Sequence, residues 1–528
     1  MTSLVRDSIA TMTGPRSESA DGSTLTSDPN SSIESTTSTP TSSTTSINSI
    51  PILKSVQDWW SSPRSLMYES KEEESDQIKQ DRLRNRNIEY ELFRTLLPSD
   101  IHIYPPQEYD NDDKHDDKDD DDVNEEYLIT GKLIDVKLDD GNFIHEFYLE
   151  NKTTTSKEQE QHIVVIHGYM AAMGYFIKNI EDLIRIPGIK LHLIDLPGFG
   201  NSSRPKFPKE FIIEPFDSLS EKINQILQIE NWFIDKIENW RINRNINQFK
   251  LIGHSMGAYL ACCYLMKYNN NNNNNKLLVS DVILVSPMGT ESNEFSLIND
   301  KRFQFNLYND PFKELQFNNN NNNDKDNDNN NIIINEELTN IWTKLGKPKF
   351  PKNWLLKKLW LKNKSPFEFL QNFGPFYSKI LSYWSFQRFK NFEIDTNKDT
   401  IELILKLHNY SYSIFNQFQG SGEIAITKLI TPEILAKLPL ADRGLIDFFV
   451  DNKINNMWIY GDNDWMNKNG GEYIYQQIND KIKNQNGDHN NDNDKISRFE
   501  IVEKAGHHIY LDNPKIFNQL VIDFFKLV

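Results

Sequence analysis

The sequence predicts an α/β protein in which a mostly parallel sheet carries helices on both faces and a large helical cap is inserted between two strands. Three observations lead to this class. Apolar runs typical of buried strands alternate with helix-like segments between residues 162 and 289. The alternation stops there and resumes at Met457, which leaves about 165 residues between two strands. Ser, Asp and His residues follow three of the apolar runs, where the carboxyl ends of parallel strands meet.

A β-hairpin is expected ahead of the parallel strands. Apolar runs at 127–130 and 143–148 flank Asp139-Asp140-Gly141-Asn142, which has the composition of a turn between antiparallel strands. The remaining strands are predicted at 162–166, 191–194, 249–252, 282–286, 457–460 and 499–502.

Ser255 is the candidate nucleophile. It lies in Gly253-His254-Ser255-Met256-Gly257, between an apolar run that ends at Ile252 and a helix-like segment that begins at Ala258. A G-x-S-x-G sequence between a strand and a helix is typical of a nucleophile elbow, in which a side chain at either glycine would collide with the neighbouring elements. Such a pentapeptide also occurs by chance as a helix start flanked by glycines. The neighbouring motifs must therefore decide whether Ser255 is a nucleophile.

The context is supplied by Asp464 and His507, which follow the predicted strands at 457–460 and 499–502. The chain order Ser, Asp, His is that of the α/β-hydrolases and differs from the orders of the chymotrypsin and subtilisin folds. We therefore expect Ser255, Asp464 and His507 to form a catalytic triad within an α/β-hydrolase fold.

For two positions of the triad, the sequence offers a second candidate residue. Asp462 competes with Asp464, and the Gly-x-x-Asp spacing after Gly461 favours Asp464. His508 competes with His507, and the position directly after Gly506 favours His507.

The proposed roles follow from acyl-transfer chemistry. A serine hydroxyl is a weak nucleophile at neutral pH, so His507 must accept its proton while Asp464 fixes the imidazole tautomer. Backbone N–H groups must stabilise the oxyanion that forms. The candidates are Met256, directly after the nucleophile, and Tyr169 or Met170, which follow the strand at 162–166. We expect His254 to have a packing and hydrogen-bonding role.

The composition argues against several other kinds of partner and site. The net charge is −18, and half of it comes from residues 109–126, which hold eleven acidic residues and two lysines. This acidic balance argues against a nucleic-acid partner. Cys262 and Cys263 are adjacent on a predicted helix, so no disulfide is expected. No apolar run is long enough for a spanning helix, and no metal or cofactor site is predicted.

We expect the chain to have five parts. The first part is expected to be disordered, because residues 31–46 contain thirteen Ser or Thr among sixteen and are too polar to form a core. Asn-rich runs at 269–275, 318–331 and 484–494 are interpreted as surface insertions. The parts are a disordered leader (1–55), a helical segment with an acidic loop (56–126), the first part of the core (127–289), the cap (290–455) and the second part of the core (456–528).

The cap contains a segment with the composition of an interfacial membrane helix. Lys344–Lys364 holds eight lysines and no acidic residue, interleaved with tryptophan, phenylalanine and leucine. Lysines can meet anionic headgroups while the apolar side chains enter the acyl boundary. The alternative is a cap helix that packs on the sheet with a solvated lysine face. Apolar and aromatic residues continue through 365–389, and we expect them to cover the acyl chains of a bound lipid.

Several motifs together resemble the lipid-acting α/β-hydrolases that include the human lipid-droplet lipase coactivator, and most closely their fungal branch. That branch has cardiolipin-specific phospholipase and lysophosphatidic acid acyltransferase members. The similarity covers about residues 56–528 outside the Asn and Asp tracts. It rests on 167–169, 195–200, 202–205 and 253–257 in the core, and on 365–367, 374–375, 410–412 and 421–426 in the cap.

The resemblance implies a phospholipid deacylase inside the cell, peripheral on the mitochondrial inner membrane, with the cytoplasm or the lipid droplet as alternatives. The human coactivator has Asn in place of the nucleophile, whereas this chain has Ser255, which disfavours a lipid-binding lipase adaptor. The family also shares a His-x4-Asp arrangement linked to acyltransferase activity, matched by His507 and Asp512. A coenzyme A thioester would be a co-substrate only of an acyltransferase. From the residues alone, Asp512 is interpreted as the cap of the last helix, with Pro514 at the first helical position.

Overall fold

The structure is a computed structural model of the chain. It describes residues 48–62, 76–106, 127–153, 160–213, 218–269, 277–293, 295–298, 358, 360–389, 400–416, 420–432, 434–486 and 496–527. The Ser/Thr-rich and acidic segments lie outside these residues, as do most of the Asn-rich runs. Of Lys344–Lys364, only Lys358 and residues 360–364 are described.

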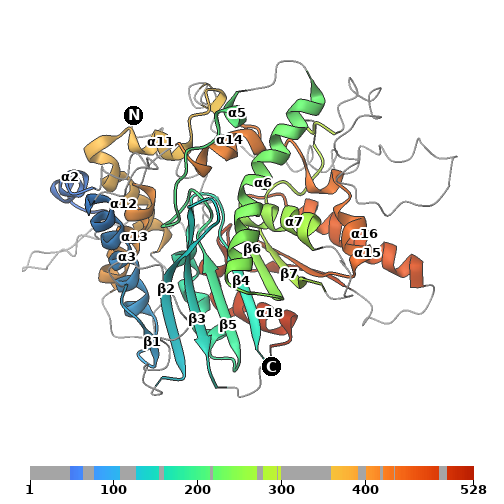
Figure 1. Cartoon of the computed structure of the whole chain (residues 1–528), viewed down its shortest axis with the longest axis horizontal. Coiled ribbons are helices and arrows are strands. Elements are labelled where there is room, and N and C mark those ends of the chain that lie inside the picture. The colour runs from blue at the N-terminus through green and yellow to red at the C-terminus, as the bar shows by residue number, and fades with distance from the viewer. Residues whose placement is uncertain are drawn as a thin grey trace, which may run out of the picture.

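A nine-stranded sheet forms the centre of the described structure, in the order β1-β2-β3-β5-β4-β6-β7-β8-β9 (Figure 1). All neighbouring strands pair in parallel except β2 with β3 and β3 with β5. The predicted parallel sheet and the predicted hairpin are therefore both confirmed. The strands are β1 (Ile101–Ile103), β2 (Ile129–Lys137), β3 (Phe143–Asn151), β4 (Gln161–Ile166), β5 (Ile189–Ile194), β6 (Phe249–His254), β7 (Val279–Val285), β8 (Asn455–Gly461) and β9 (Ser497–Val502).

Helices cover the sheet because the crossovers between parallel strands place them on its faces. α6 packs with α7, and α4 packs with α18. The core helices are α4 (Ile177–Ile184), α5 (Lys209–Ile212), α6 (Leu219–Asn243), α7 (Met256–Tyr268), α16 (Lys468–Asn486), α17 (Ile509–Asp512) and α18 (Pro514–Phe525), with the 3₁₀ turn η4 (Met173–Phe176).

The inserted cap lies between β7 and β8, as the interrupted alternation predicts. Its described helices are α11 (Pro366–Gln371), α12 (Tyr377–Arg388), α13 (Thr400–Phe415), α14 (Ile426–Leu429) and α15 (Leu445–Asn452), with the 3₁₀ turns η6 (Gly374–Phe376), η7 (Gly422–Ala425) and η8 (Leu440–Asp442).

The N-terminal helices belong to the same helical layer as the cap. α2 (Ile52–Trp60) packs on α12, and α3 (Asp76–Leu96) packs on α13 and β1 (Figure 1). α2 begins inside the segment 1–55 that the sequence indicates as a leader, and β1 of the segment 56–126 joins the sheet. The cap is thus supported by residues more than 300 positions away in the chain.

The two cysteines are free and buried on α7, and Arg443 Nη1 lies 3.5 Å from Cys263 Sγ. Burial raises the pKa of both thiols, so neither has thiolate character at neutral pH. Within the described part of the chain, no helix is long and apolar enough to cross a membrane.

Candidate active site

Ser255 lies in a strained turn between β6 and α7, with φ 53° and ψ −116°. Both flanking positions must be glycine, because any side chain there would collide with neighbouring backbone. A Cβ on Gly253 would lie 2.7 Å from the Ala258 Cα. A Cβ on Gly257 would lie 2.4 Å from the carbonyl oxygen of His167. The turn is the strand-to-helix elbow that the G-x-S-x-G sequence predicts, and it presents the Ser255 hydroxyl at the carboxyl edge of the sheet.

The structure brings Ser255, His507 and Asp464 into one hydrogen-bonded chain. His507 Nε2 lies 3.0 Å from Ser255 Oγ, and His507 Nδ1 lies 3.1 Å from Asp464 Oδ1. In a neutral ring, these partners fix the tautomer in which Nδ1–H donates to the carboxylate and Nε2 accepts from the serine hydroxyl. This is the arrangement a general base needs in order to take the serine proton.

Asp462 and His508, the alternatives to Asp464 and His507, make other contacts. Asp462 Oδ1 accepts from the Ala505 N–H at 3.0 Å and so orders the turn that leads to His507. The ring of His508 packs against Tyr510 and Tyr175. The geometry therefore assigns the relay to Asp464 and His507, the residues that the spacing favours.

A buried serine holds the carboxylate of Asp464. Ser286, the residue after β7, donates its hydroxyl to Oδ2, while the Met466 N–H donates to Oδ1 at 3.0 Å. Ser286 itself has a positive φ of 44°. Ser286 was not predicted from the sequence. Its position directly after β7, the neighbour of β8, is a usable signal, because the carboxyl ends of parallel strands meet at one edge of the sheet.

The loop that carries His507 is held from three directions. The His254 imidazole donates through Nε2 to the His507 carbonyl oxygen at 3.0 Å, which gives His254 the hydrogen-bonding role expected from the sequence. The Gly506 N–H donates to Asp512 Oδ2 at 2.9 Å. Arg388, the last residue of the cap helix α12, forms an ion pair with Asp512 and donates to the His508 carbonyl oxygen at 3.4 Å.

The prediction that Asp512 caps the last helix is wrong. Asn513 is the N-cap of α18, and its side-chain oxygen accepts from the Ile516 N–H at 3.4 Å. Asp512 ends the short helix α17, and its side chain turns back to the Gly506 N–H and to Arg388 instead. Its observed contacts are with the His507 loop and the cap.

Three histidines near the site are held neutral. Burial lowers the pKa of His254 well below its usual value, with a further contribution from His507, and burial beside Arg388 does the same for His508. Burial lowers the pKa of His167 to about 4. None of these three rings carries a charge at neutral pH, so each acts on the site through hydrogen bonds and packing.

The loop after β4 passes directly against the nucleophile, since a Cβ on Gly168 would lie 2.8 Å from the Ser255 Cβ. His167 fixes this loop, because its Nδ1–H donates to the Gly168 carbonyl oxygen and its Nε2 accepts from the Leu196 N–H. Met170 follows with a φ of 52°. The oxyanion roles of Tyr169, Met170 and Met256 stay predictions; Met256 begins α7, where backbone N–H groups lack helical partners.

Aromatic side chains of the cap and core lie together beside this loop. The ring of Phe367 on α11 packs edge-on against Tyr169, with centroids 5.6 Å apart, and against Phe199 and Phe415. The Tyr169 hydroxyl donates to the Glu423 carbonyl oxygen of η7 at 3.0 Å. The cap therefore meets the expected oxyanion loop through aromatic contacts and a hydrogen bond.

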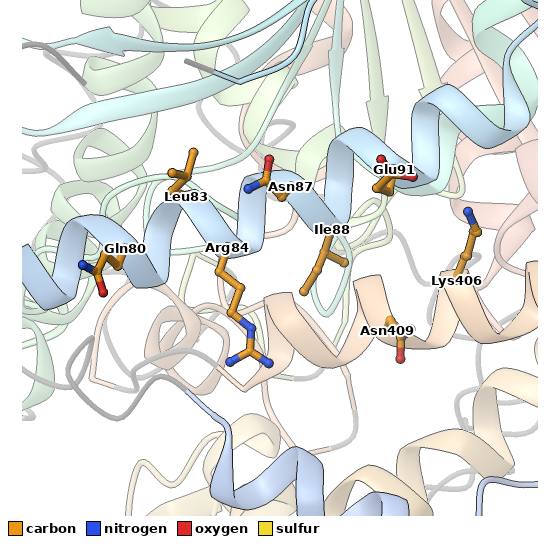
Figure 2. Close-up of a pocket in the computed structure, with 8 residues that line it drawn as sticks. All are labelled: Gln80, Leu83, Arg84, Asn87, Ile88, Glu91, Lys406 and Asn409. Carbon is orange, nitrogen blue, oxygen red and sulfur yellow. The ribbon is translucent and has the colours of Figure 1, made fainter. Parts of the chain in front are cut away.

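A groove of about 520 Å³ lies elsewhere, between α3 and α13 (Figure 2). It contains none of the residues of the Ser255 site. Its lining is mixed polar and aliphatic, from Gln80, Leu83, Arg84, Asn87, Ile88, Glu91, Lys406 and Asn409.

Comparison with known proteins gives the family. The α/β hydrolase fold model matches residues 161–514. The protein ECM18 of Saccharomyces cerevisiae is 27% identical over 72% of this chain and 74% of its own length. ICT1 of the same yeast, named a 1-acylglycerol-3-phosphate O-acyltransferase, is 25% identical over 68% of this chain and 81% of its own length. A mouse (lyso)-N-acylphosphatidylethanolamine lipase is 26% identical over 70% and 80%.

Among solved structures, an esterase from Exiguobacterium antarcticum aligns with 75% of this chain and 99% of its own, at 14% identity and a TM-score of 0.41. The family match spans both parts of the core and the cap between them. This chain belongs to the α/β hydrolase fold family and is similar to ECM18 and ICT1.

Proposed function

We propose that this protein is a serine phospholipase that removes an acyl chain from cardiolipin or a related phospholipid at a membrane surface. The observation that carries the proposal is the hydrogen-bonded chain from Ser255 Oγ through His507 to Asp464, with distances of 3.0 and 3.1 Å. An adaptor that only bound lipid would have no use for a strained nucleophile elbow and an aligned base.

The reaction would proceed in two halves. His507 Nε2 takes the proton of Ser255 as Oγ attacks the ester carbonyl, and the oxyanion forms beside the N–H groups of Met256 and of Tyr169 or Met170. Collapse breaks the ester bond, and His507 returns the proton to the departing lysophospholipid oxygen. Water then attacks the acyl-serine, with His507 again as the base, and releases the fatty acid.

A lysophosphatidic acid acyltransferase is the second candidate, because the relative ICT1 bears that name. The same acyl-serine would be loaded from a coenzyme A thioester and resolved by the hydroxyl of the lysophospholipid instead of water. The two candidates thus share Ser255, His507 and Asp464 and differ only in the acyl donor and acceptor.

The proposed place of action is a peripheral position on the mitochondrial inner membrane, with the cytoplasm or the lipid droplet as alternatives. The substrate preference and the location rest on the motifs of the fungal branch. Lipid analysis of a strain that lacks the protein, beside one that expresses the Ser255→Ala variant, tests both the headgroup and the organelle.

Purified protein tests the chemistry. Wild type and Ser255→Ala are compared for fatty acid release from phospholipid vesicles and for acyl transfer from oleoyl coenzyme A to lysophosphatidic acid. Alanine keeps the Cβ of the elbow, so the fold is preserved and both activities should fall on the order of 10⁴- to 10⁶-fold. A variant that keeps more than a few per cent of wild-type activity would rule out the serine mechanism.

A further inference from the structure

Two side-chain nitrogen atoms in the loop after Asp464 are buried and lack an acceptor within the described part of the chain. They are Nε1 of Trp465 and Nδ2 of Asn467, which precede α16. A buried donor without an acceptor is destabilising, and native structures rarely leave one unexplained. The two nitrogens therefore indicate a ligand that supplies oxygen atoms.

Both donors are held next to the catalytic relay. The indole of Trp465 packs on the imidazole of His507, with ring centroids 4.5 Å apart. The side-chain oxygen of Asn467 accepts from the Asn469 N–H at 3.2 Å, which leaves only its amide nitrogen to bind a ligand. Between them, the Met466 N–H donates to Asp464 Oδ1 at 3.0 Å. The loop that orients Asp464 thus also fixes the two donors.

The donors are covered together with the catalytic side chains. Ser255 is 6% exposed, and the side chains of His507 and Asp464 are 8% and 1% exposed. Since Trp465 lies against His507, its N–H belongs to the same covered region as the relay and not to a separate part of the core.

The position of His507 indicates which part of a lipid meets these donors. The alcohol oxygen that leaves in hydrolysis, or that attacks in acyl transfer, must reach Nε2, because it exchanges its proton there. The glycerol and phosphate attached to that oxygen therefore lie beside His507 and its neighbour Trp465. The acyl chain stays on Ser255 instead.

The chemistry of the donors favours a phosphate oxygen. An indole N–H and the amide nitrogen of an asparagine can only donate, so the group that they bind must be an acceptor. Both residues precede α16, a helix of 19 residues whose N-terminal end carries the positive end of the helix dipole. Hydrogen bonds to a charged acceptor are stronger than those to an ester or hydroxyl oxygen.

We propose that Trp465 Nε1 and Asn467 Nδ2 bind a phosphate oxygen of the lysophospholipid, which is the leaving group of hydrolysis or the acceptor of acyl transfer. The proposal rests on the proposed function and extends its site from the reacting atoms to the phosphate of the lipid. It holds for either acyl acceptor, because both alcohols occupy the same place beside His507. The site should therefore prefer lysolipids that carry a phosphate over neutral glycerides.

Ligand binding to the Ser255→Ala protein tests the proposal without turnover. Octanoyl lysophosphatidic acid and octanoylglycerol share the acyl chain and the glycerol and differ only in the phosphate, and calorimetry gives the affinity for each. The Ser255→Ala parent should prefer the lipid with the phosphate. Adding Trp465→Phe, which keeps a ring against His507 but removes the N–H, should lower the affinity for octanoyl lysophosphatidic acid about tenfold and leave that for octanoylglycerol unchanged.

Asn467→Asp is a second variant, because aspartate can still accept from the Asn469 N–H while its carboxylate repels a phosphate. It should weaken binding of octanoyl lysophosphatidic acid more than Asn469→Asp, the matched control that adds the same charge to the same loop. Trp232→Phe, which removes an indole N–H on α6, should change neither affinity.

Four results would overturn the proposal. They are no preference for the phosphate in the Ser255→Ala parent, no loss in Trp465→Phe, a loss in Trp465→Phe that is equal for the two lipids, and equal losses in Asn467→Asp and Asn469→Asp. An equal loss for the two lipids would mean that the donors bind an oxygen of the glycerol or the ester.

Failure of the proposed function gives a different result. If the wild type neither releases fatty acid nor transfers acyl chains, but Trp465→Phe still removes the phosphate preference of the Ser255→Ala parent, the phosphate site stands and the acyl chemistry is wrong. If the wild type is active and Trp465→Phe leaves the preference intact, only the phosphate site is wrong.

Discussion

Two strained serines organise the site at the scale of single residues. Ser255 and Ser286 both have positive φ angles, of 53° and 44°, a conformation that costs on the order of 1–3 kcal/mol for such residues. Each is held by its own N–H, which donates to the next strand: Ser255 to the Val285 carbonyl oxygen and Ser286 to that of Ile459. The strain therefore aims one hydroxyl at His507 and the other at Asp464.

Ser286→Ala tests this assignment. Loss of the hydroxyl leaves Asp464 Oδ2 without that donor, so the carboxylate orients His507 less well and kcat for fatty acid release should fall about tenfold with little change in KM. Ser280→Ala is the matched control, since Ser280 lies on the same strand and donates to Asp281 far from the site. An unchanged kcat in Ser286→Ala would remove Ser286 from the positioning of the relay.

Asp512→Asn tests which of the two acyl acceptors the protein uses. In Asp512→Asn the amide oxygen can still accept from the Gly506 N–H, although the charge that pairs with Arg388 is lost, so hydrolysis should stay within a few-fold of wild type. Asp464→Asn should lose on the order of 10⁴-fold in kcat, because it imposes the wrong imidazole tautomer.

The measurement follows fatty acid release and acyl transfer to lysophosphatidic acid in parallel for both variants. Selective loss of transfer in Asp512→Asn, with hydrolysis intact, would make this protein an acyltransferase first and reverse the order of the two proposed functions.

At the scale of elements, a buried polar cluster ties α3 to the edge of the sheet. His145 on β3 lies between Glu89 on α3, at 2.7 Å, and Asp135 on β2, at 2.6 Å, and Arg86 pairs with Asp135. Burial opposes the charge on His145, but the two carboxylates outweigh it and raise the pKa of His145 from 6.5 to about 10. At neutral pH the ring is an imidazolium between two acids.

This cluster predicts a pH dependence of folding. Because the folded pKa exceeds the unfolded one, its contribution to the free energy of unfolding is fully present below about pH 6.5 and is lost as the pH rises toward about 10. Wild type should therefore lose stability across that range, and His145→Gln should be less stable at neutral pH with a flatter profile. Urea unfolding midpoints across the range provide the check; parallel profiles for the two proteins would contradict the account.

The strands were predictable from sequence for a physical reason, and the contacts of the cap were not. Strands buried on both faces are continuous apolar runs, and the residues after them must converge at one edge, which located Ser255, Asp464 and His507. Arg388 and Asp512 are separated by 124 positions, and no local pattern joins them. On α2, Ser55 and Asp58 are buried while Leu53 and Trp60 are exposed. This was equally hidden, because it depends on hydrogen bonds between Ser55 and Asp58 and the distant residues Pro375 and Ser378.

The whole molecule is acidic with a basic region in its cap. Residues 109–126 carry half of the net charge of −18, whereas Lys344–Lys364 carries eight lysines and no acidic residue. At the described end of that segment Trp360 is buried and Leu361 is 69% exposed. The segment thus remains the candidate for membrane contact that the sequence predicts.

Charge removal tests the basic segment. Each lysine near an anionic surface is worth about 1 kcal/mol, so replacing Lys344, Lys347, Lys349 and Lys352 with Gln should weaken sedimentation with cardiolipin-containing vesicles and reduce its salt dependence. Unchanged sedimentation would favour the alternative, in which the segment packs on the core with its lysines in solvent.

The proposed function depends on Ser255, activated by His507, acting as the nucleophile that forms an acyl enzyme with phospholipid. Its most direct test is mass analysis after reaction with a fluorophosphonate, which transfers its phosphonyl group to an activated serine oxygen and releases fluoride. The wild type should give one adduct, on Ser255, and His507→Ala should react much more slowly. Phospholipid vesicles should protect Ser255 from the reagent. Equal labelling of Ser255→Ala and wild type, or no adduct on the wild type, would contradict it.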